Sequence, residues 1–248
     1  MIRFFAAPHD ISADCINLGA EDLEHIRVLR LRPDELFTVC DGDGTDYICR
    51  LRKHNNEKVA EIVEKHQSLG EPSIKCKVFM AYSKGDRLDY AVQKSVELGA
   101  NEIILFESER CVAVPRDIPK KTARLQRIAL ETAKQSNRGI IPNVTSAGSF
   151  DTMIKKAIED SALSLMFYEC EDDLHIKPVL EQHFSGQKNQ SKKPVSIITG
   201  PEGGFKPHEV ALAQSKGISI VSLGPRILRS ETAPAVALAA LMFHTGNF

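Results

Sequence analysis

Two glycine-containing segments near the end of the chain combine a permissive backbone with charged side chains. The first is Gly200-Pro201-Glu202-Gly203-Gly204-Phe205, and the second, 223–233, reads LGPRILRSETA. Each follows a short apolar run, 195–199 or 218–223, typical of a strand buried on both faces. Because ligands of open α/β sheets bind outside the carboxyl ends of strands, both segments predict parts of a small-molecule site. Its charged members are Glu202, Arg226, Arg229 and Glu231.

Each segment is expected to lead into a helix. Proline suits the first turn of a helix, where its missing N–H is not needed, so the first helix is expected to begin near Lys206-Pro207. Ser230 is the expected N-cap of the second helix, with the acidic Glu231 in its first turn.

Several other chemistries lack their residue patterns. No G-x-G-x-x-G or G-x-x-x-x-G-K-[ST] occurs, and the first strand–helix unit of the second half carries Tyr82-Ser83-Lys84-Gly85-Asp86 instead, which disfavours a dinucleotide or phosphate cradle. The histidines show no H-E-x-x-H spacing and the six cysteines no C-x-x-C pair, so we expect no metal site and reduced thiols in the core. Without a G-x-S-x-G elbow, lone residues such as Ser230 and Cys111 are best explained as a cap and a core thiol.

Composition is that of an ordinary globular protein. The 248 residues are 42% hydrophobic and carry a net charge of −1, and no run of about 18 apolar residues occurs. The first residues reach charge and proline too soon for a signal peptide. These features predict a soluble, cytoplasmic protein without a membrane partner.

Positive charge is concentrated in one stretch. Residues 110–138 hold eight Lys or Arg residues and two acids, a local balance of +6, whereas residues 1–70 have a balance of −4. Such a stretch is either the solvated face of a helix or a strip that faces nucleic-acid phosphates.

The pattern of elements changes near Gly70-Glu71-Pro72-Ser73 and predicts two domains, 1–70 and 73–248. In the first, strand-like pieces flank the turn 41–44 and one helix is expected over 21–31, which predicts a small β-barrel. In the second, strands alternate with helices, which predicts an α/β fold with a parallel sheet. The polar residues 185–193 predict a surface loop. Expected strands are 74–81, 102–107, 163–167, 195–199 and 218–223, and expected helices 86–98, 119–137, 150–160, 173–184, 206–216 and 231–243.

The two glycine segments, with Glu209 after the first, closely resemble the paired C-terminal motifs of the ribosomal RNA small subunit methyltransferase E family, which belongs to the SPOUT superfamily. Residues 25–30 before the turn 41–44 resemble the family's PUA-like RNA-binding barrel. Departures are small: Lys134 stands where an acid is common, Asn137 where glycine is usual and Ser230 where threonine is usual. Four further segments resemble the motifs in the middle of the family's sequences: Lys84, Gln93–Gly99, Ser108–Arg110 and Gln135–Arg138.

The resemblance implies an S-adenosylmethionine-dependent enzyme that methylates N3 of a uridine in 16S rRNA, within an assembled small ribosomal subunit. It further implies a deep trefoil knot, which general topology rules would not propose, and a homodimer with each site near the interface. Implied cofactor-binding residues are Thr199, Gly200, Pro201, Gly203, Leu223, Gly224, Ile227, Leu228 and Arg229. Implied RNA-binding residues are Arg27, Arg30, Lys84, Arg110, Lys120, Lys121, Arg124, Gln135 and Arg138.

Methylation at N3 requires loss of a proton, so the site should offer a proton acceptor and a cation. Arg138 and Arg229 are the candidates for charge stabilisation. Glu202 is either the base or an orienting group, unless it caps a helix or pairs with an arginine. The alternative functions are a non-catalytic RNA-binding assembly factor, a methyltransferase acting on another RNA position, and a nicotinamide-dependent oxidoreductase.

Overall fold

A computed structural model describes residues 2–32, 34–54, 57–159, 161–185 and 193–248. The chain forms two compact units. The first contains 1–71 and 131–141, and the second contains 72–130 and 142–248. The division after Glu71 lies where the pattern of the sequence changes. Residues 131–141, however, belong to the first unit although they lie in the middle of the chain. The loop predicted over 185–193 lies largely outside the described residues.

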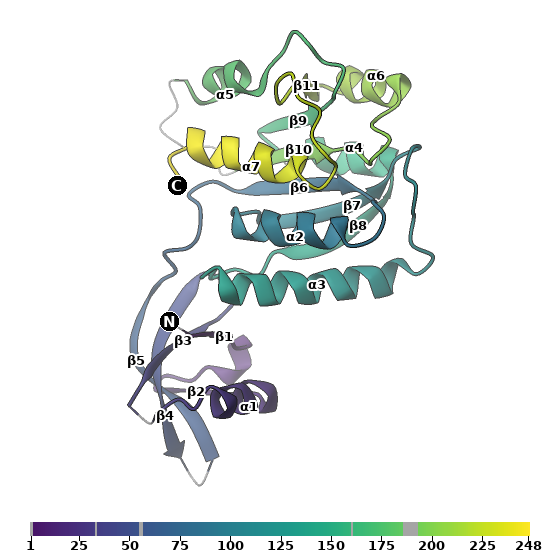
Figure 1. Ribbon diagram of the computed structural model, residues 1–248. Coiled ribbons are helices and arrows are strands. Elements are labelled where there is room, and N and C mark those ends of the chain that lie inside the picture. Colours follow the sequence, from purple (N-terminus) through teal and green to yellow (C-terminus); the bar gives the residue numbers. More distant parts are fainter. Residues whose placement is uncertain (1, 33, 55–56, 160, 186–192) are drawn as a thin grey trace. The chain divides into compact units, whose positions relative to one another are not determined.

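The first unit is built on a five-stranded sheet, with strand order β1-β3-β4-β5-β2 (Figure 1). The predicted hairpin is confirmed: β3 and β4 pair antiparallel, with Val39 opposite Tyr47. Asp41 holds the turn, because its Oδ1 accepts hydrogen bonds from the N–H groups of Asp43 and Thr45 at 2.8 and 3.0 Å. Short strands β1 and β2, absent from the sequence prediction, complete the sheet. The elements are β1 (Arg3–Phe5), η1 (Pro8–Asp10), β2 (Cys15–Asn17), α1 (Ala20–Val28), β3 (Leu36–Cys40), β4 (Thr45–His54) and β5 (Glu57–Gln67).

A buried ion pair joins the 131–141 segment to Glu71, which follows β5 in the same unit. The guanidinium of Arg138, whose side chain is 2% exposed, donates from Nε and Nη2 to the two carboxylate oxygens of Glu71 at 2.8 and 2.9 Å. Glu71 Oε1 also accepts the N–H groups of Gly139 and Ile140. A buried ion pair with this many hydrogen bonds is costly to break from one side, because the remaining charge stays away from water.

The second unit contains a six-stranded parallel sheet of order β11-β9-β10-β6-β7-β8. The predicted α/β class is therefore confirmed, whereas the trefoil knot stays a prediction. Strand β8, rich in small and polar residues, was missed. The elements are β6 (Cys76–Ala81), α2 (Arg87–Glu97), β7 (Glu102–Glu107), α3 (Ile118–Gln135), β8 (Asn143–Ser149), α4 (Phe150–Glu159), β9 (Leu163–Phe167), α5 (Ile176–Phe184), β10 (Val195–Thr199), α6 (Pro207–Ser215), β11 (Ser219–Val221) and α7 (Ala233–His244), and α3 runs from the second unit into the first.

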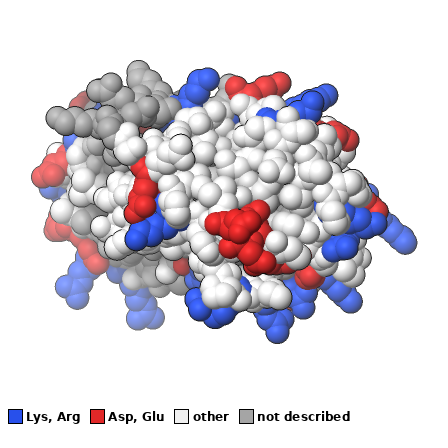
Figure 2. Space-filling view, turned by 90° about the horizontal axis from the view of Figure 1, so that it is seen from above, with Lys and Arg blue, Asp and Glu red and all other residues white. Residues whose placement is uncertain are grey.

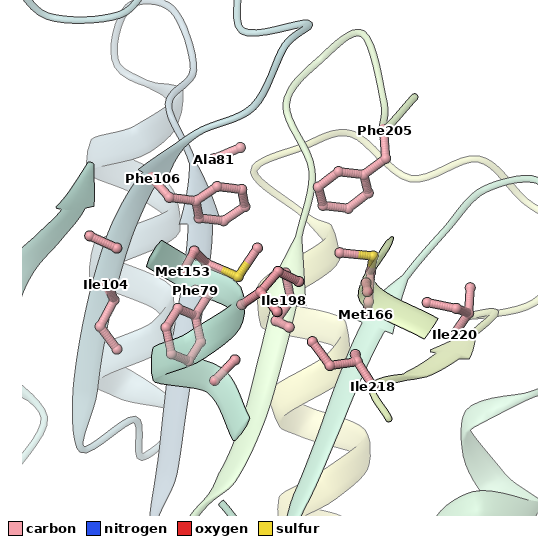
Figure 3. Close-up of a cluster of buried hydrophobic side chains, with 14 residues drawn as sticks. Phe79, Ala81, Ile104, Phe106, Met153, Met166, Ile198, Phe205, Ile218 and Ile220 are labelled. Carbon is pink, nitrogen blue, oxygen red and sulfur yellow. The ribbon is translucent and has the colours of Figure 1, made fainter. Parts of the chain in front are cut away.

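One row of side chains crosses this sheet and forms its core. The strand registers place Ile220, Met166, Ile198, Phe79 and Ile104 side by side on the same face of five strands (Figure 3). Helix α4 packs over this face, and α2 and α7 cover the other (Figure 1). Layers on both faces explain why the strands read as continuous apolar runs. In the part of the chain that the structure describes, no helix has the length and apolar character needed to cross a membrane.

Replacement of Glu71 by alanine should cost about 3–5 kcal/mol of unfolding free energy, because it removes the carboxylate that pairs with the buried guanidinium of Arg138. Urea unfolding measures the loss. Glu24→Ala is the matched control in the same unit: its partner Arg27 is 73% exposed, so the loss should stay below about 1 kcal/mol. Equal losses in both variants would contradict the buried-pair interpretation.

Candidate functional site

A cavity of about 460 Å³ lies at the carboxyl ends of β9, β10 and β11, and its walls come entirely from the second unit. Both predicted glycine segments line it. The two strands that precede these segments, β10 and β11, are not neighbours in the sheet, because β9 lies between them. The lining residues are Arg87, Phe167, Tyr168, Glu169, Asp172, Thr199–Gly204, Ser222–Glu231 and Ala233.

The segment 200–205 is a tight loop anchored in the core. Phe205 is buried and stacks parallel to Phe106, with ring centroids 6.4 Å apart (Figure 3). The N–H of Gly204 donates to the carbonyl of Pro201 at 3.0 Å and closes the turn. The loop therefore leaves β10, turns back and inserts its aromatic end into the sheet's core.

Protein contacts explain two of the loop's glycines. A Cβ on Gly203 would lie 3.1 Å from the Cβ of Arg110 and 3.3 Å from its carbonyl oxygen. Gly204 has φ +67°, a conformation that favours glycine, and its Cα lies against the carboxylate of Glu169. Both glycines thus permit close packing of neighbouring loops around the cavity.

The second segment is more open. Gly224 has φ +107° with free space around it, so its backbone conformation accounts for the glycine. Ile227 is 85% exposed, and Arg226 and Arg229 are exposed as well. Helix α7 begins after this segment at Ala233, with Thr232 as N-cap, so the prediction of Ser230 as N-cap was wrong. Ser230 instead donates to Glu231 Oε2 at 3.2 Å.

The predicted start of the first helix is confirmed. Lys206 is the N-cap of α6, and Pro207 occupies the first turn. The carboxylate of Glu209 accepts the N–H of Lys206 at 2.9 Å.

Glu202 has an asymmetric environment. Its Oε1 accepts the N–H of Lys84 and Nη1 of Arg87, both at 2.9 Å, whereas its Oε2 is buried without a hydrogen-bond partner among the described residues. Burial alone would raise the pKa of Glu202, but hydrogen bonds from the N–H groups of Lys84 and Glu202 and from Arg87 outweigh it and lower the pKa. Glu202 is therefore a carboxylate at neutral pH, with one acceptor oxygen left to use.

The residues that line the cavity after β9 were not predicted from the sequence. Phe167, Tyr168, Glu169 and Asp172 line the cavity from the end of β9, although no motif marks them. Only the order of strands reveals them, because β9 lies between the two strands that carry the glycine segments. Arg87 was missed for the same reason: it follows β6, the neighbour of β10.

All nine predicted cofactor-binding residues line the cavity, as do the candidate catalytic residues Arg229 and Glu202. The third candidate, Arg138, does not line it. It belongs to the first unit, where its buried guanidinium pairs with Glu71, and its roles in catalysis and RNA contact stay predictions.

The predicted RNA-binding residues fall into two groups. Arg30 and Lys120 are exposed and have no ion-pair partner among the described residues. Gln135 and Lys84 are also exposed. Arg27 pairs with Glu24, and Lys121 and Arg124 both pair with Asp89 of α2. Arg110 donates from Nη1 to the carbonyls of Gly203 and Phe205. The +6 stretch is thus partly neutralised.

The end of the second unit that carries α5 and α6 shows little positive charge. Viewed from that side, a broad uncharged area surrounds one group of acidic side chains, while Lys and Arg lie at the edges (Figure 2). Among the residues that the structure describes, basic side chains therefore do not gather on this face.

Removal of one donor should shift the titration of Glu202. Arg87→Met should raise the pKa of the Glu202 carboxyl, because the charged form loses a cationic hydrogen bond. Carbon-detected NMR of labelled glutamate carboxyls measures this, and Arg124→Met, which affects Asp89 instead, should leave it unchanged. At pH values above the ordinary glutamate pKa, the charged carboxylate of Glu202 stabilises the folded state. This stabilisation is lost as the pH falls through the lowered pKa that Glu202 has in the folded protein. An unmoved titration in Arg87→Met would refute this assignment.

Comparisons with known proteins agree with this geometry. An RNA methyltransferase domain matches residues 70–242, and an RNA methyltransferase PUA domain matches residues 18–63. The expected PUA-like N-terminal domain is thereby confirmed.

Relatives match over nearly the whole chain. Ribosomal RNA small subunit methyltransferase E of Bacillus subtilis is 32% identical and covers 94% of this chain and 91% of its own length. The crystal structure of the enzyme of that name from Neisseria gonorrhoeae, bound to S-adenosyl methionine, is 30% identical, with TM-score 0.80 and coverage of 98% and 97%. A methyltransferase from Legionella pneumophila in complex with the same cofactor is 28% identical, with TM-score 0.80 and the same coverage. The chain therefore belongs to the ribosomal RNA small subunit methyltransferase E family.

Proposed function

We propose that this protein is an S-adenosylmethionine-dependent methyltransferase that acts on N3 of a uridine in 16S rRNA. The observation that carries the proposal is the cavity between the two glycine segments and the end of β9. Family membership adds the reaction class, since the Bacillus subtilis relative is named for ribosomal RNA methylation and the Neisseria gonorrhoeae relative binds S-adenosyl methionine.

The residues of the cavity fit this cofactor. Its volume of about 460 Å³ falls within the range of small-molecule sites. The lining includes four carboxyl side chains, those of Glu169, Asp172, Glu202 and Glu231, which suit a ligand carrying a sulfonium and an ammonium group. Glu202 Oε2 is a buried acceptor still without a partner among the described residues.

Main-chain groups and apolar side chains would hold the cofactor. Thr199, Gly200 and Pro201 present backbone at the end of β10, while Leu223 and Ile227 supply apolar surface from the second segment. When bound, S-adenosylmethionine supplies an electrophilic methyl group.

Arg229 is the proposed stabiliser of the substrate. Loss of the N3 proton places negative charge on the uridine oxygens, and a guanidinium at the cavity can neutralise it as it develops. A base works best with a pKa near the operating pH, so the lowered pKa of Glu202 favours an orienting carboxylate over a general base.

The substrate must present an unpaired uridine, because N3 lies on the Watson–Crick edge. We assign the surrounding RNA contacts to the PUA-like unit, with Arg30, and to exposed basic residues such as Lys120. The preferred substrate in this proposal is an assembled small ribosomal subunit.

The proposal is tested by incubating the protein with labelled S-adenosylmethionine and small subunits from cells lacking this activity, followed by nucleoside analysis. Naked 16S rRNA serves as the parallel substrate. Labelled 3-methyluridine in subunits alone is the expected result. A different methylated nucleoside would refute N3 as the target, and cofactor-independent RNA binding without transfer would support a non-catalytic assembly factor.

Arg229→Ala should lower kcat about 100-fold while changing the Kd for S-adenosylmethionine less than about threefold, because its charge acts mainly in the transition state. Single-turnover kinetics and calorimetry measure the two quantities. Arg226→Ala, which removes another exposed arginine from the cavity lining, is the matched control and should retain kcat within about threefold. Equal losses of turnover and cofactor affinity in Arg229→Ala would contradict this role.

We further propose that two copies of the chain associate through α7. Its outward side carries an apolar row at helical spacing, Val236, Ala239, Ala240 and Phe243, of which Phe243 is 79% exposed. The helix begins next to the cavity, so a second copy seated on it would lie near the site.

Phe243→Glu should convert a dimer into a monomer, because a charge on this row cannot be buried against a second copy. Sedimentation equilibrium measures the mass. Val112→Glu, a similarly exposed apolar position before α3, is the control and should leave the mass unchanged. A monomeric parent protein, or a dimeric Phe243→Glu variant, would contradict the proposed interface.

A further inference from the structure

The turn 108–111, which follows β7, is joined by hydrogen bonds to the glycine loop 200–205 and to the start of α6. The turn closes on itself, with the N–H of Cys111 donating to the carbonyl of Ser108 at 3.0 Å. It lies within the second unit, like the loop.

From the turn, Arg110 binds the backbone of the loop. Its Nη1 donates to the carbonyl of Gly203 at 3.0 Å and to that of Phe205 at 3.4 Å. The backbones approach so closely that a side chain on Gly203 would press against Arg110. The guanidinium thus fixes the direction of two peptide groups in a segment whose glycines would otherwise leave it free to adopt several conformations.

In the opposite direction, Glu209 binds the turn. Glu209 is 4% exposed, and its carboxylate accepts hydrogen bonds from Ser108 Oγ and from the N–H of Glu109, each at 3.1 Å. The same carboxylate accepts the N–H of Lys206 where the loop ends. Lys206 Nζ in turn pairs with Glu109.

We propose that Arg110 and Glu209 are positioning residues that hold the 200–206 segment in the geometry that binds S-adenosylmethionine, so that Arg110 serves the cofactor cavity and not the RNA. Neither residue lines the cavity, and both act through the loop that does. The inference rests on the proposed function, and it adds to that function the two residues that hold the cofactor-binding loop in place.

The consequence differs from that of an RNA contact. Without Arg110, the carbonyls of Gly203 and Phe205 lose a charge-assisted donor, and the loop must be ordered when the cofactor binds. Cofactor affinity then falls, but saturating cofactor restores the ordered loop and hence turnover. An arginine bound to phosphate would instead lower RNA affinity and the steepness of its salt dependence.

Arg110→Ala should raise the Kd and KM for S-adenosylmethionine about tenfold and keep kcat at saturating cofactor within about threefold. Its binding to purified 16S rRNA should keep the wild-type slope of log K against log salt. Arg110→Lys keeps the charge but lacks the planar fork, so it should recover only part of the cofactor affinity. Glu209→Gln should also weaken cofactor binding, because its amide group must face one of the N–H donors.

Lys120→Ala is the matched control, since Lys120 is exposed and has no ion-pair partner among the described residues. It should leave cofactor affinity unchanged and reduce the salt slope by about one. Unchanged cofactor affinity in Arg110→Ala, or a reduced salt slope, would overturn the inference. A wild-type protein that binds no S-adenosylmethionine would refute the proposed function itself, a result that calorimetry on the wild type distinguishes at the outset.

Discussion

The site depends on the insertion of Phe205 into the core of the parallel sheet. A loop of three glycines has little conformational preference of its own, and the aromatic stack of Phe205 on Phe106 gives it a fixed end. Beneath that stack, the row of side chains across five strands fixes the relative positions of the strand ends. The cavity is therefore formed by backbone that the core holds from below.

Hydrogen bonds from neighbouring loops complete the arrangement. Glu202 receives donors from the β6–α2 connection and from the first residue of α2, and Glu209 receives donors from the turn after β7. The loop after β10 is thus fixed to the two strand ends on one side, while the end of β9 meets it at Gly204 on the other. A binding site built of main chain needs such support, because it has few large side chains to order it.

Much of this could be predicted from the sequence where a signal is local. The buried strands read as apolar runs, Asp41-Gly42-Asp43-Gly44 marked its hairpin, and the two glycine segments marked the cavity. The cavity residues that only the order of the strands brings together could not be predicted from the sequence. Glu169 and Arg87 line the cavity only because β9 and β6 flank β10, and no spacing along the chain encodes that.

Charge was the least predictable feature. Arg138 and Arg229 look alike in a motif, yet the first is buried against Glu71 and the second is exposed at the cavity. Two of the basic residues in the 110–138 stretch share a single partner, Asp89. A count of charges gives a net value, whereas availability to a ligand depends on partners that only the fold brings together.

Hydrogen exchange measured with and without S-adenosylmethionine locates the bound cofactor on the chain. If the cofactor binds in this cavity, exchange should slow in 199–206, in 222–231 and in the residues that follow β9, and nowhere else. Protection centred on any other segment, or none at saturating cofactor, would contradict the assignment of this cavity.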